Sequence, residues 1–204
     1  ADGMITGITR RFSVAYEAIR NVIDARQSQR VFGLTIVVTR GRTVFIADTT
    51  VNEEPTSVML ADIAEQAAEK ARELGHEPRV AFLSHSNFGN PLSGRGDRLR
   101  DAVHLLESRR PSFEYDGEMS ADVALDPSLL ELYPFSRLSG PANVLVMPHL
   151  DSANIASKLL QKIGGGTAIG PILLGLSKPV QIVPMGSTVS DMVNMAALAA
   201  AEAG

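Results

Sequence analysis

Short apolar runs of strand length alternate along this chain with longer segments of helical periodicity. The runs "RVAFLS" and "ANVLVMP" are each followed by a polar loop and then by an amphipathic segment. Buried strands that alternate with helices in this way are typical of a parallel sheet with helices on its faces. The sequence therefore predicts an α/β fold with a mostly parallel sheet flanked by helices.

The segment 55–78 is the clearest predicted helix, with Thr56 as its expected N-cap and Gly75 as its C-terminal stop. Its apolar residues recur at helical spacing, and they predict a buried face made of Leu60, Ile63, Ala64, Ala67, Ala71 and Leu74. The same periodicity predicts further helices at 13–24, 97–110, 155–166 and 187–203. Two segments rich in β-branched residues flank Arg40 and Gly41, which predicts a β-hairpin there.

The composition excludes several classes of protein. With 204 residues, 45% of them hydrophobic, the chain is long enough for one domain with a sizeable core. The net charge of −4, without a basic stripe, argues against a general nucleic-acid binder. Cysteine is absent, which excludes disulfides, thiolate zinc sites and cysteine nucleophiles. No uncharged apolar run reaches ~18 residues, so we expect no membrane contact and a cytoplasmic protein.

The first residues, "ADGMITGITRRF", read as a loop at a strand end that leads into a helix, and they include no initiator methionine at position 1. We therefore expect the chain to be a fragment of a longer protein. Processing of the N-terminus accounts for the same start.

Three polar loops follow apolar runs and are rich in Ser, Asn, Gly and Asp: Ser84–Asn90, Pro148–Asn154 and Pro184–Asp191. Ligands of open α/β sheets sit beyond the carboxyl ends of the strands, where such loops lie. The same residue types are also those that ordinary turns require. From the pattern alone, a binding site and a set of turns are equally good interpretations.

Asp191 has two interpretations. Thr188 and Asp191 fit the S/T-x-x-D/E capping pattern ahead of an apolar run, which explains their spacing fully. A general base at a junction between a strand and a helix also fits, because such junctions face the cleft. The local sequence favours the helix cap.

Other polar residues carry weaker signals. Asp48 and Asn52 fit an Asx-type turn better than a cleft. His149 and Asp151 are too few for a metal site, so no metal is expected. The run of glycines at 164–166 follows a predicted helix, so it fits a C-cap rather than a phosphate loop. Arg10, with its neighbour Arg11, fits a phosphate contact and a solvated helix face equally well.

Read together, longer segments resemble a known family. They are "ADGMITG", "FIADTTVNEEPT", "YDGEMSADVAL", "NVLVMPHLDSANIASKLLQKIGGGTAIGPILLGLSKPV" and "VSDMVNMAALAA". In this order they resemble the phosphate acetyl/butyryltransferase family. Phrases such as "EPRVAFLSHSNFGNP" and "LSGPANVLVMP" are most similar to the phosphotransacetylase-like C-terminal region of large bacterial NADP-dependent malic enzymes. The resemblance spans almost the whole chain.

The resemblance implies a phosphotransacetylase-like fold of two lobes, similar to those of isocitrate and isopropylmalate dehydrogenases, with a cleft that binds coenzyme A. It implies that the N-terminal part of the unit is missing here. Residues 1–18 would then be a remnant of the first lobe, 19–170 the inserted second lobe, and 171–204 a strand and helix that return to the first lobe.

The resemblance also gives meaning to the loop after "KPVQIV". Phosphotransacetylases carry "VNDLSRG" and then an acidic pair, whose second acid is the proposed base for the CoA thiol. Here Pro184 stands at the serine position and Met185 at the arginine position, while Gly186 and Asp191 match the glycine and the base. A missing cation removes the electrostatic stabilisation that acyl transfer to phosphate needs. Only a neighbouring arginine, such as Arg95 or Arg137, would compensate. We therefore expect no catalytic residues, with Asp191 a vestigial base.

The function implied is a regulatory and oligomer-forming domain of an NADP-dependent malic enzyme, inhibited by acetyl-CoA. NADP and Mg²⁺ or Mn²⁺ would serve only the malic enzyme module, and self-association as a dimer or higher oligomer is expected. The alternative is an active phosphate acetyltransferase, and a third possibility is an assembly domain that binds nothing. The residues expected to contact acetyl-CoA are Ser84, Ser86, Asn87, Asn154, Gly186, Ser187, Asp191 and Arg10.

Overall fold

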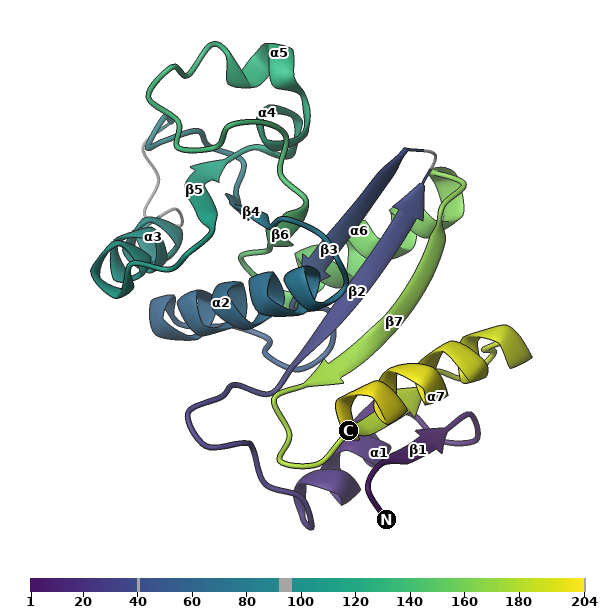
Figure 1. Cartoon of the computed structure of the whole chain (residues 1–204). Helices are drawn as coiled ribbons and strands as arrows, with labels where there is room; N and C mark the ends of the chain where they lie inside the picture. The colour runs from purple at the N-terminus through teal and green to yellow at the C-terminus, as the bar shows by residue number, and fades with distance from the viewer. Residues whose placement is uncertain (40, 92–96, 204) are drawn as a thin grey trace.

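The computed structural model describes residues 1–39, 41–91 and 97–203 (Figure 1). The strands are β1 (Met4–Gly7), β2 (Phe32–Thr39), β3 (Arg42–Ala47), β4 (Arg79–Leu83), β5 (Glu114–Met119), β6 (Val144–Val146), β7 (Thr167–Leu174) and β8 (Val180–Val183). The helices are α1 (Phe12–Arg20), α2 (Ser57–Glu73), α3 (Asp97–Arg109), α4 (Ala121–Leu125), α5 (Pro127–Leu130), α6 (Leu150–Ile163) and α7 (Val189–Ala203). The predicted α/β class is confirmed.

A mostly parallel sheet has the strand order β5-β4-β6-β3-β2-β7. The pairs β5–β4, β4–β6 and β6–β3 are parallel, whereas β2 is antiparallel to both of its neighbours, β3 and β7. Among the described strands of this sheet, only β2 therefore runs against the common direction. The predicted hairpin is confirmed by the pairing of β2 with β3, although Arg40 at its turn lies outside the described residues.

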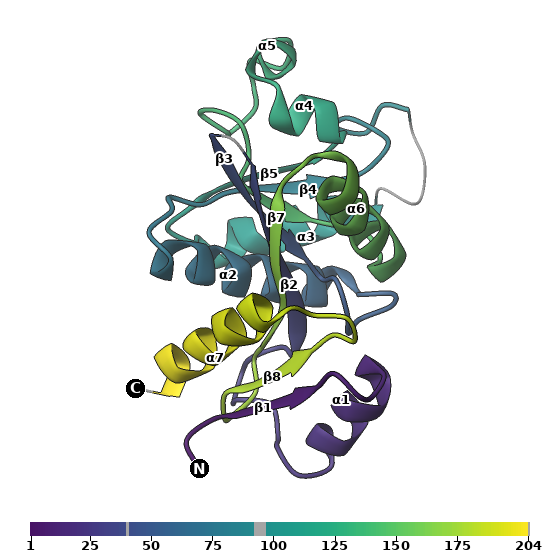
Figure 2. The same ribbon diagram turned by 90° about the vertical axis from the view of Figure 1, so that its right-hand side faces the viewer.

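Alternating side chains of the central strands point to opposite faces of this sheet, as strand geometry requires. On β6, Val144 and Val146 belong to the core shared with α2 and α3, while Leu145 belongs to the core on the other face. The second core includes Ala153 of α6 and Val123 of α4. Figure 2 shows α2 and α6 on opposite sides of the strands. The sheet is thus covered on both faces, which explains why its strands are continuously apolar.

The boundaries of α2 follow its sequence signals. The Thr56 hydroxyl accepts a hydrogen bond from the Met59 amide at 3.3 Å, so the predicted N-cap is confirmed. Gly75 has a φ of +83° and its amide donates to the Arg72 carbonyl, which ends the helix as predicted. The predicted buried face is confirmed except at Leu74, which is 39% exposed because it lies at the end of the helix.

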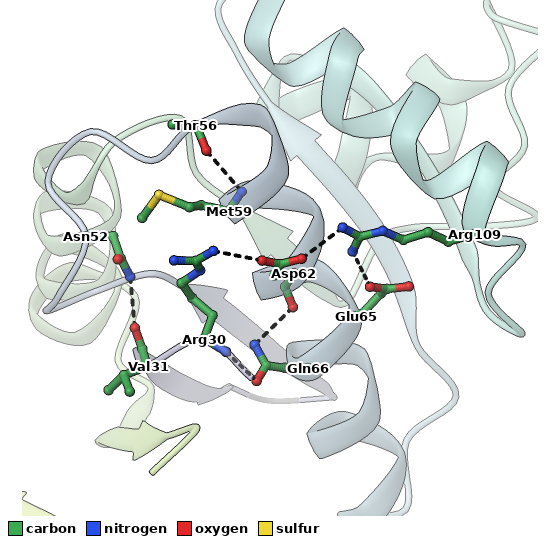
Figure 3. Close-up of polar contacts among 9 residues, drawn as sticks. All are labelled: Arg30, Val31, Asn52, Thr56, Met59, Asp62, Glu65, Gln66 and Arg109. Atoms are coloured by element: carbon green, nitrogen blue, oxygen red, sulfur yellow. Dashed lines mark hydrogen bonds and ion pairs between the residues drawn. The ribbon is translucent and has the colours of Figure 1, made fainter. Parts of the chain in front are cut away.

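Charged side chains bind α2 to its neighbours. Asp62 accepts hydrogen bonds from Arg30 at 3.0 Å and from Arg109 of α3 at 2.9 Å (Figure 3). The side chain of Gln66 adds a contact to the backbone amide of Arg30 at 3.1 Å. These bonds hold the segment before β2, α2 and α3 in one arrangement.

The two ends of the chain meet in a second, smaller sheet. Strands β1 and β8 pair in parallel, with α7 on one side and α1 on the other (Figure 2). The buried side chain of Gln181 on β8 accepts a hydrogen bond from the Leu173 amide at 2.8 Å and donates one to the Leu173 carbonyl at 3.2 Å. One side chain therefore links the small sheet to β7 of the larger one. Strand β7 itself continues in the larger sheet to Leu174, past the predicted boundary at 170/171, and the domain boundaries stay a prediction.

Several predicted boundaries are wrong. Met4–Gly7, predicted as part of a loop, form strand β1, and α6 ends at Ile163 rather than at residue 166. Helix α1 ends at Arg20 rather than at residue 24, and the Arg20 guanidinium donates to the Ile23 carbonyl beyond it. The segment 149–154 is not a loop, because α6 begins at Leu150. Its first turn forms because Ala153 packs into the core beneath the sheet and Ser152 donates to the His149 carbonyl at 2.7 Å.

In the part of the chain that the structure describes, no helix is long and apolar enough to cross a membrane.

Candidate functional site

A cavity of about 300 Å³ opens between α6 and the loop that joins β8 to α7. The loop contributes Pro184, Met185, Gly186 and Ser187, and α7 contributes Asp191. The α6 side is formed by Asn154, Ser157, Lys158, Gln161 and Lys162, and the remaining lining residues are Thr35, Thr49, Thr50, Ala168, Gly170 and Pro171. The cavity therefore joins segments that are far apart in the sequence. Helix α6 and the loop between β8 and α7 can be located in Figure 2.

The floor of the cavity is held by hydrogen bonds between its own lining residues. The hydroxyls of Thr35 on β2 and Thr49 after β3 lie 3.0 Å apart. The Asn154 amide group donates to the Thr49 carbonyl at 3.2 Å. This bond fixes one face of α6 against the end of β3, and it commits one donor of Asn154 to the protein itself.

Asp191 forms a capping box with Thr188 at the start of α7. Its Oδ2 accepts from the Thr188 amide and from the Thr188 hydroxyl, each at 2.8 Å, and the Asp191 amide donates to Thr188 Oγ1 at 3.2 Å. The predicted helix cap is confirmed. The backbone and side-chain hydrogen bonds from Thr188 lower the pKa of the Asp191 carboxyl below its ordinary value of 3.8. A carboxylate held in this way is a weak base at neutral pH, because an effective general base has a pKa near the working pH.

The loop beside Asp191 contains no charged side chain. Met185 is 59% exposed at the cavity, and Pro184 accepts a backbone hydrogen bond from Ser187 at 3.2 Å. Gly186 has a φ of +85°, a conformation that other residues rarely adopt, so this position favours glycine. The chain thus keeps the turn at this position without a hydroxyl or a cation at residues 184 and 185.

Two cations reach the cavity from α6, and the sequence analysis missed both. Lys158 and Lys162 follow Asn154 at intervals of four residues, so the three side chains share one helix face. The spacing is visible in the sequence. This spacing indicates a site only when the buried face of α6 is known, and that face is formed by Ala153 and Ser157.

Three of the predicted contacts with acetyl-CoA lie elsewhere, around Glu118 on β5. The buried Ser86 hydroxyl donates to Glu118 Oε1 at 2.9 Å and lies 3.2 Å from the Ser84 hydroxyl. The side chain of Asn87 accepts from the Ser120 amide at 2.8 Å. These residues shape the turn after β4, and they are not among the residues that line the cavity. Their contact with a ligand remains a prediction.

Two arginines considered in the sequence analysis, Arg10 and Arg137, also lie away from the cavity. Arg10 is exposed just before α1. Arg137 forms an ion pair with Glu107 and lies over the Tyr115 ring at 5.7 Å. Arg95 lies outside the described residues. Of the arginines that the structure describes, none lines this cavity.

The other polar candidates have structural partners. Asp48 is buried and accepts from the Gly33, Thr50, Val51 and Asn52 amides and from the Asn52 side chain. Asp48 therefore organises the turn after β3, which confirms the interpretation as an Asx-type turn. Gly164 is the C-cap of α6, and Gly165 has a φ of +63°, so the glycine run ends a helix as predicted.

No group of three His, Asp or Glu side chains within the described ranges could hold a metal ion. His149 contacts Arg98 at 3.1 Å through Nε2, and it is the N-cap residue of α6.

Two larger cavities share no lining residue with the cavity between α6 and the β8–α7 loop. One of about 460 Å³ surrounds Lys70, Arg26 and Lys178, and one of about 480 Å³ is an apolar groove beside β1 and α7. The cavity between α6 and the β8–α7 loop is smaller, but it lies at the carboxyl end of β8 and contains Asp191. Position in the fold, rather than size, makes it the candidate site.

Known proteins are similar to this chain over its whole length. The chain is 56% identical to an NADP-dependent malic enzyme from Rhizobium meliloti (strain 1021). The aligned region covers 100% of this chain and 27% of that protein. It is 34% identical to a phosphate acetyltransferase from Bacillus subtilis (strain 168), covering 100% of this chain and 64% of the enzyme. A phosphotransacetylase structure from Streptococcus pyogenes superimposes with a TM-score of 0.94 at 33% identity, covering 100% of this chain and 63% of that one.

The chain thus spans about a quarter of the length of the malic enzyme and less than two thirds of the length of the transferases. Residues 1–200 match the family described as Phosphate acetyl/butaryl transferase. Since the match extends over almost all of its 204 residues, the chain belongs to the phosphate acetyl/butyryltransferase family.

Proposed function

We propose that this chain is a non-catalytic regulatory and oligomer-forming domain of an NADP-dependent malic enzyme, and that acetyl-CoA binds it as an allosteric inhibitor. NADP and Mg²⁺ or Mn²⁺ serve only the malic enzyme module of the same protein, in the cytoplasm. The 56% identity to a malic enzyme of Rhizobium meliloti supports this assignment.

The observation that carries the proposal is the loop at Pro184 and Met185. Acyl transfer to phosphate requires a donor for the negative charge that develops in the transition state. Neither side chain can donate a hydrogen bond, and proline also lacks a backbone amide hydrogen. Loss of one such donor slows a reaction by about 10²–10³-fold. The low pKa and the capping bonds of Asp191 weaken it further as a base for the CoA thiol.

The cavity is well placed for regulation, because its two walls come from different parts of the fold. One wall is α6 on the larger sheet, and the other is the turn between β8 and α7 on the smaller sheet. A ligand that contacts both walls favours the arrangement in which they are close. Its binding energy then shifts the equilibrium between open and closed forms, which is the basis of allosteric control.

The test is an acetyl-CoA titration of the protein in its full natural length, with NADP-dependent malate oxidation as the readout. We expect acetyl-CoA to inhibit malate oxidation to saturation, while free acetate does not. The variant Asn154→Leu alters the cavity wall, and it should need more acetyl-CoA for the same inhibition. Unchanged malate oxidation at saturating acetyl-CoA would contradict the proposal.

An active phosphate acetyltransferase remains the alternative, and Lys158 and Lys162 favour it. These side chains bring positive charge to the cavity that Met185 does not supply. Formation of acetyl phosphate from acetyl-CoA and phosphate by the full-length protein, lost in Asp191→Asn, would establish the alternative.

Self-association is part of the proposal. Three apolar side chains on the outer face of α6 are exposed: Ile155 by 58%, Leu159 by 52% and Ile163 by 80%. Exposed apolar stripes of this kind often form protein interfaces. Sizing at several concentrations should show a dimer or a higher oligomer, and a monomer at every concentration would contradict this part.

A further inference from the structure

Helix α7 contributes to cavities on both faces of the larger sheet. Its first turn carries Asp191 at the cavity beside α6. Its last turn carries Glu202, which lines a cavity beside α2 and lies 2.8 Å from the ammonium group of Lys70 on that helix. Helices α6 and α2 lie on opposite sides of the strands (Figure 2). A movement of α7 as one body therefore affects the cavity beside α6 and the ion pair with Lys70 together.

Two connecting segments join the smaller sheet, with α7, to the larger one in the described part of the chain. They are residues 21–31, between α1 and β2, and residues 175–179, between β7 and β8. The two segments lie side by side, because the Arg26 amide donates to the Gly175 carbonyl at 2.8 Å and the Ser177 amide donates to the Asp24 carbonyl at 2.9 Å. Such short segments between packed elements are the usual hinges of a closing movement.

The core contact of α7 lies between its two ends. Met195 is buried against the larger core, about one turn after Asp191 and about two turns before Glu202. A methionine side chain is flexible and can keep such a contact while the helix tilts. With Met195 as the pivot, a tilt that brings the β8–α7 loop towards α6 moves Glu202 away from Lys70.

This tilt costs free energy because it separates two charges that are shielded from water. The side chains of Lys70 and Glu202 are 11% and 18% exposed. Opposite charges attract each other more strongly where little water surrounds them than at an open surface. Glu73 contacts the same ammonium at 2.8 Å, but it belongs to α2 itself, so a tilt of α7 leaves this second contact unchanged.

We infer that the ion pair between Lys70 and Glu202 opposes closure of the cavity beside α6 and thereby limits the affinity for the ligand bound there. Both are positioning residues, because they act through α7 and do not line that cavity. The inference rests on the proposed function for the identity of the ligand, acetyl-CoA. The closing movement belongs to the protein itself and can be measured without the ligand.

The experiment compares the full-length protein with Glu202→Gln, which keeps the shape of the side chain and removes its charge. Glu73→Gln is the matched control, since both carboxylates contact Lys70 at 2.8 Å but only Glu202 belongs to α7. Calorimetry measures the dissociation constant of acetyl-CoA. Nitroxide amino acids at two exposed positions, Asp151 on α6 and Ser190 on α7, report the distance between these helices without ligand. Circular dichroism confirms that each variant is folded.

We expect Glu202→Gln to bind acetyl-CoA about fivefold more tightly than the wild type, at the lower end of ordinary couplings between sites. Loss of a contact made only in the open form increases the population of the closed form, and the apparent affinity rises with that population. Without ligand, this variant should show a larger fraction of short distances between α6 and α7. Lys70→Met should behave as Glu202→Gln does, and Glu73→Gln should match the wild type in both measurements.

Two results would overturn the inference and leave the proposed function intact. One is an equal change of acetyl-CoA affinity in Glu202→Gln and Glu73→Gln, and the other is an unchanged distribution of distances in Glu202→Gln. Weaker binding of acetyl-CoA by Glu202→Gln would overturn it as well, since the ion pair would then favour closure. If the wild type binds no acetyl-CoA, the proposed function fails, while the distances still decide whether the ion pair opposes closure.

Discussion

The ammonium group of Lys70 on α2 lies 2.8 Å from Glu202 in the last turn of α7. A second carboxylate, Glu73, contacts the same ammonium at 2.8 Å. Lys70 is only 9% exposed, so this ion pair is largely shielded from water. It fixes one end of α7 to the larger sheet's helix α2, while the other end of α7 carries Asp191 at the candidate site.

Lys70→Met should destabilise the protein by about 1–3 kcal/mol. Removal of one partner of a buried pair leaves the other charge uncompensated, although the partial exposure of Glu73 reduces the cost. Urea unfolding of the variant measures the loss. Lys178→Met removes an exposed lysine and should change the free energy of unfolding by less than about 0.5 kcal/mol. Equal stability of Lys70→Met and wild type would show that the pair contributes nothing.

The ion pairs of Lys70 with Glu202 and Glu73 also predict that the free energy of unfolding falls at alkaline pH. Burial lowers the pKa of the Lys70 ammonium, but the hydrogen bonds that it donates to Glu202 and Glu73 outweigh burial and raise the pKa above 10.5. A raised folded-state pKa gives stability that is fully present below 10.5 and is lost as the pH rises through the folded-state value. The wild type should therefore lose its greater free energy of unfolding, relative to Lys70→Met, as the pH rises through the folded-state pKa of Lys70. A stability difference that stays constant to pH 12 would contradict this assignment.

Gln181→Leu should destabilise the protein by about 2–4 kcal/mol. Leucine fills a similar space but leaves the buried amide and carbonyl of Leu173 without their partners, and each unsatisfied group costs about 1–3 kcal/mol. The matched control is Gln161→Leu, because Gln161 is exposed on α6. Thermal unfolding of both variants compares them. A melting temperature for Gln181→Leu equal to that of the control would rule out a structural role for the link between the sheets.

Features that depend on neighbouring residues could be predicted from the sequence. Thr188 and Asp191 are three residues apart, and their capping box needs only the local chain. Thr56, Gly75 and the β2–β3 hairpin followed in the same way from short-range rules. The strand order could not be derived, since β6 lies between β3 and β4, which precede it by many residues.

The candidate site was predicted only in part, because its residues depend on which face of α6 is buried. Ile155, Leu159 and Ile163 of α6 are apolar but exposed, whereas Ala153 and Ser157 are buried. With the helix rotated in this way, Lys158 and Lys162 reach the cavity. The contacts of Ser86 with Glu118 span 32 residues in the sequence and likewise follow from tertiary packing alone.

Asp191→Ala should cost about 1 kcal/mol of stability, the usual effect of losing a helix cap. The lowered pKa of the Asp191 carboxyl also makes this stability depend on pH in the acid range. The stability from the Thr188 contacts is present above 3.8 and is lost as the pH falls through the folded-state pKa. Urea unfolding at pH 7 and pH 2 tests both statements. A difference between variant and wild type that is as large at pH 2 as at pH 7 would contradict the pKa assignment.

The central claim is that this domain holds acetyl-CoA without consuming it. Equilibrium dialysis of the full-length protein against acetyl-labelled acetyl-CoA, with inorganic phosphate present, measures both properties at once. The account predicts saturable binding, with the bound label recovered as intact acetyl-CoA after prolonged incubation. Recovery of the label as acetyl phosphate, or no saturable binding at all, would contradict it.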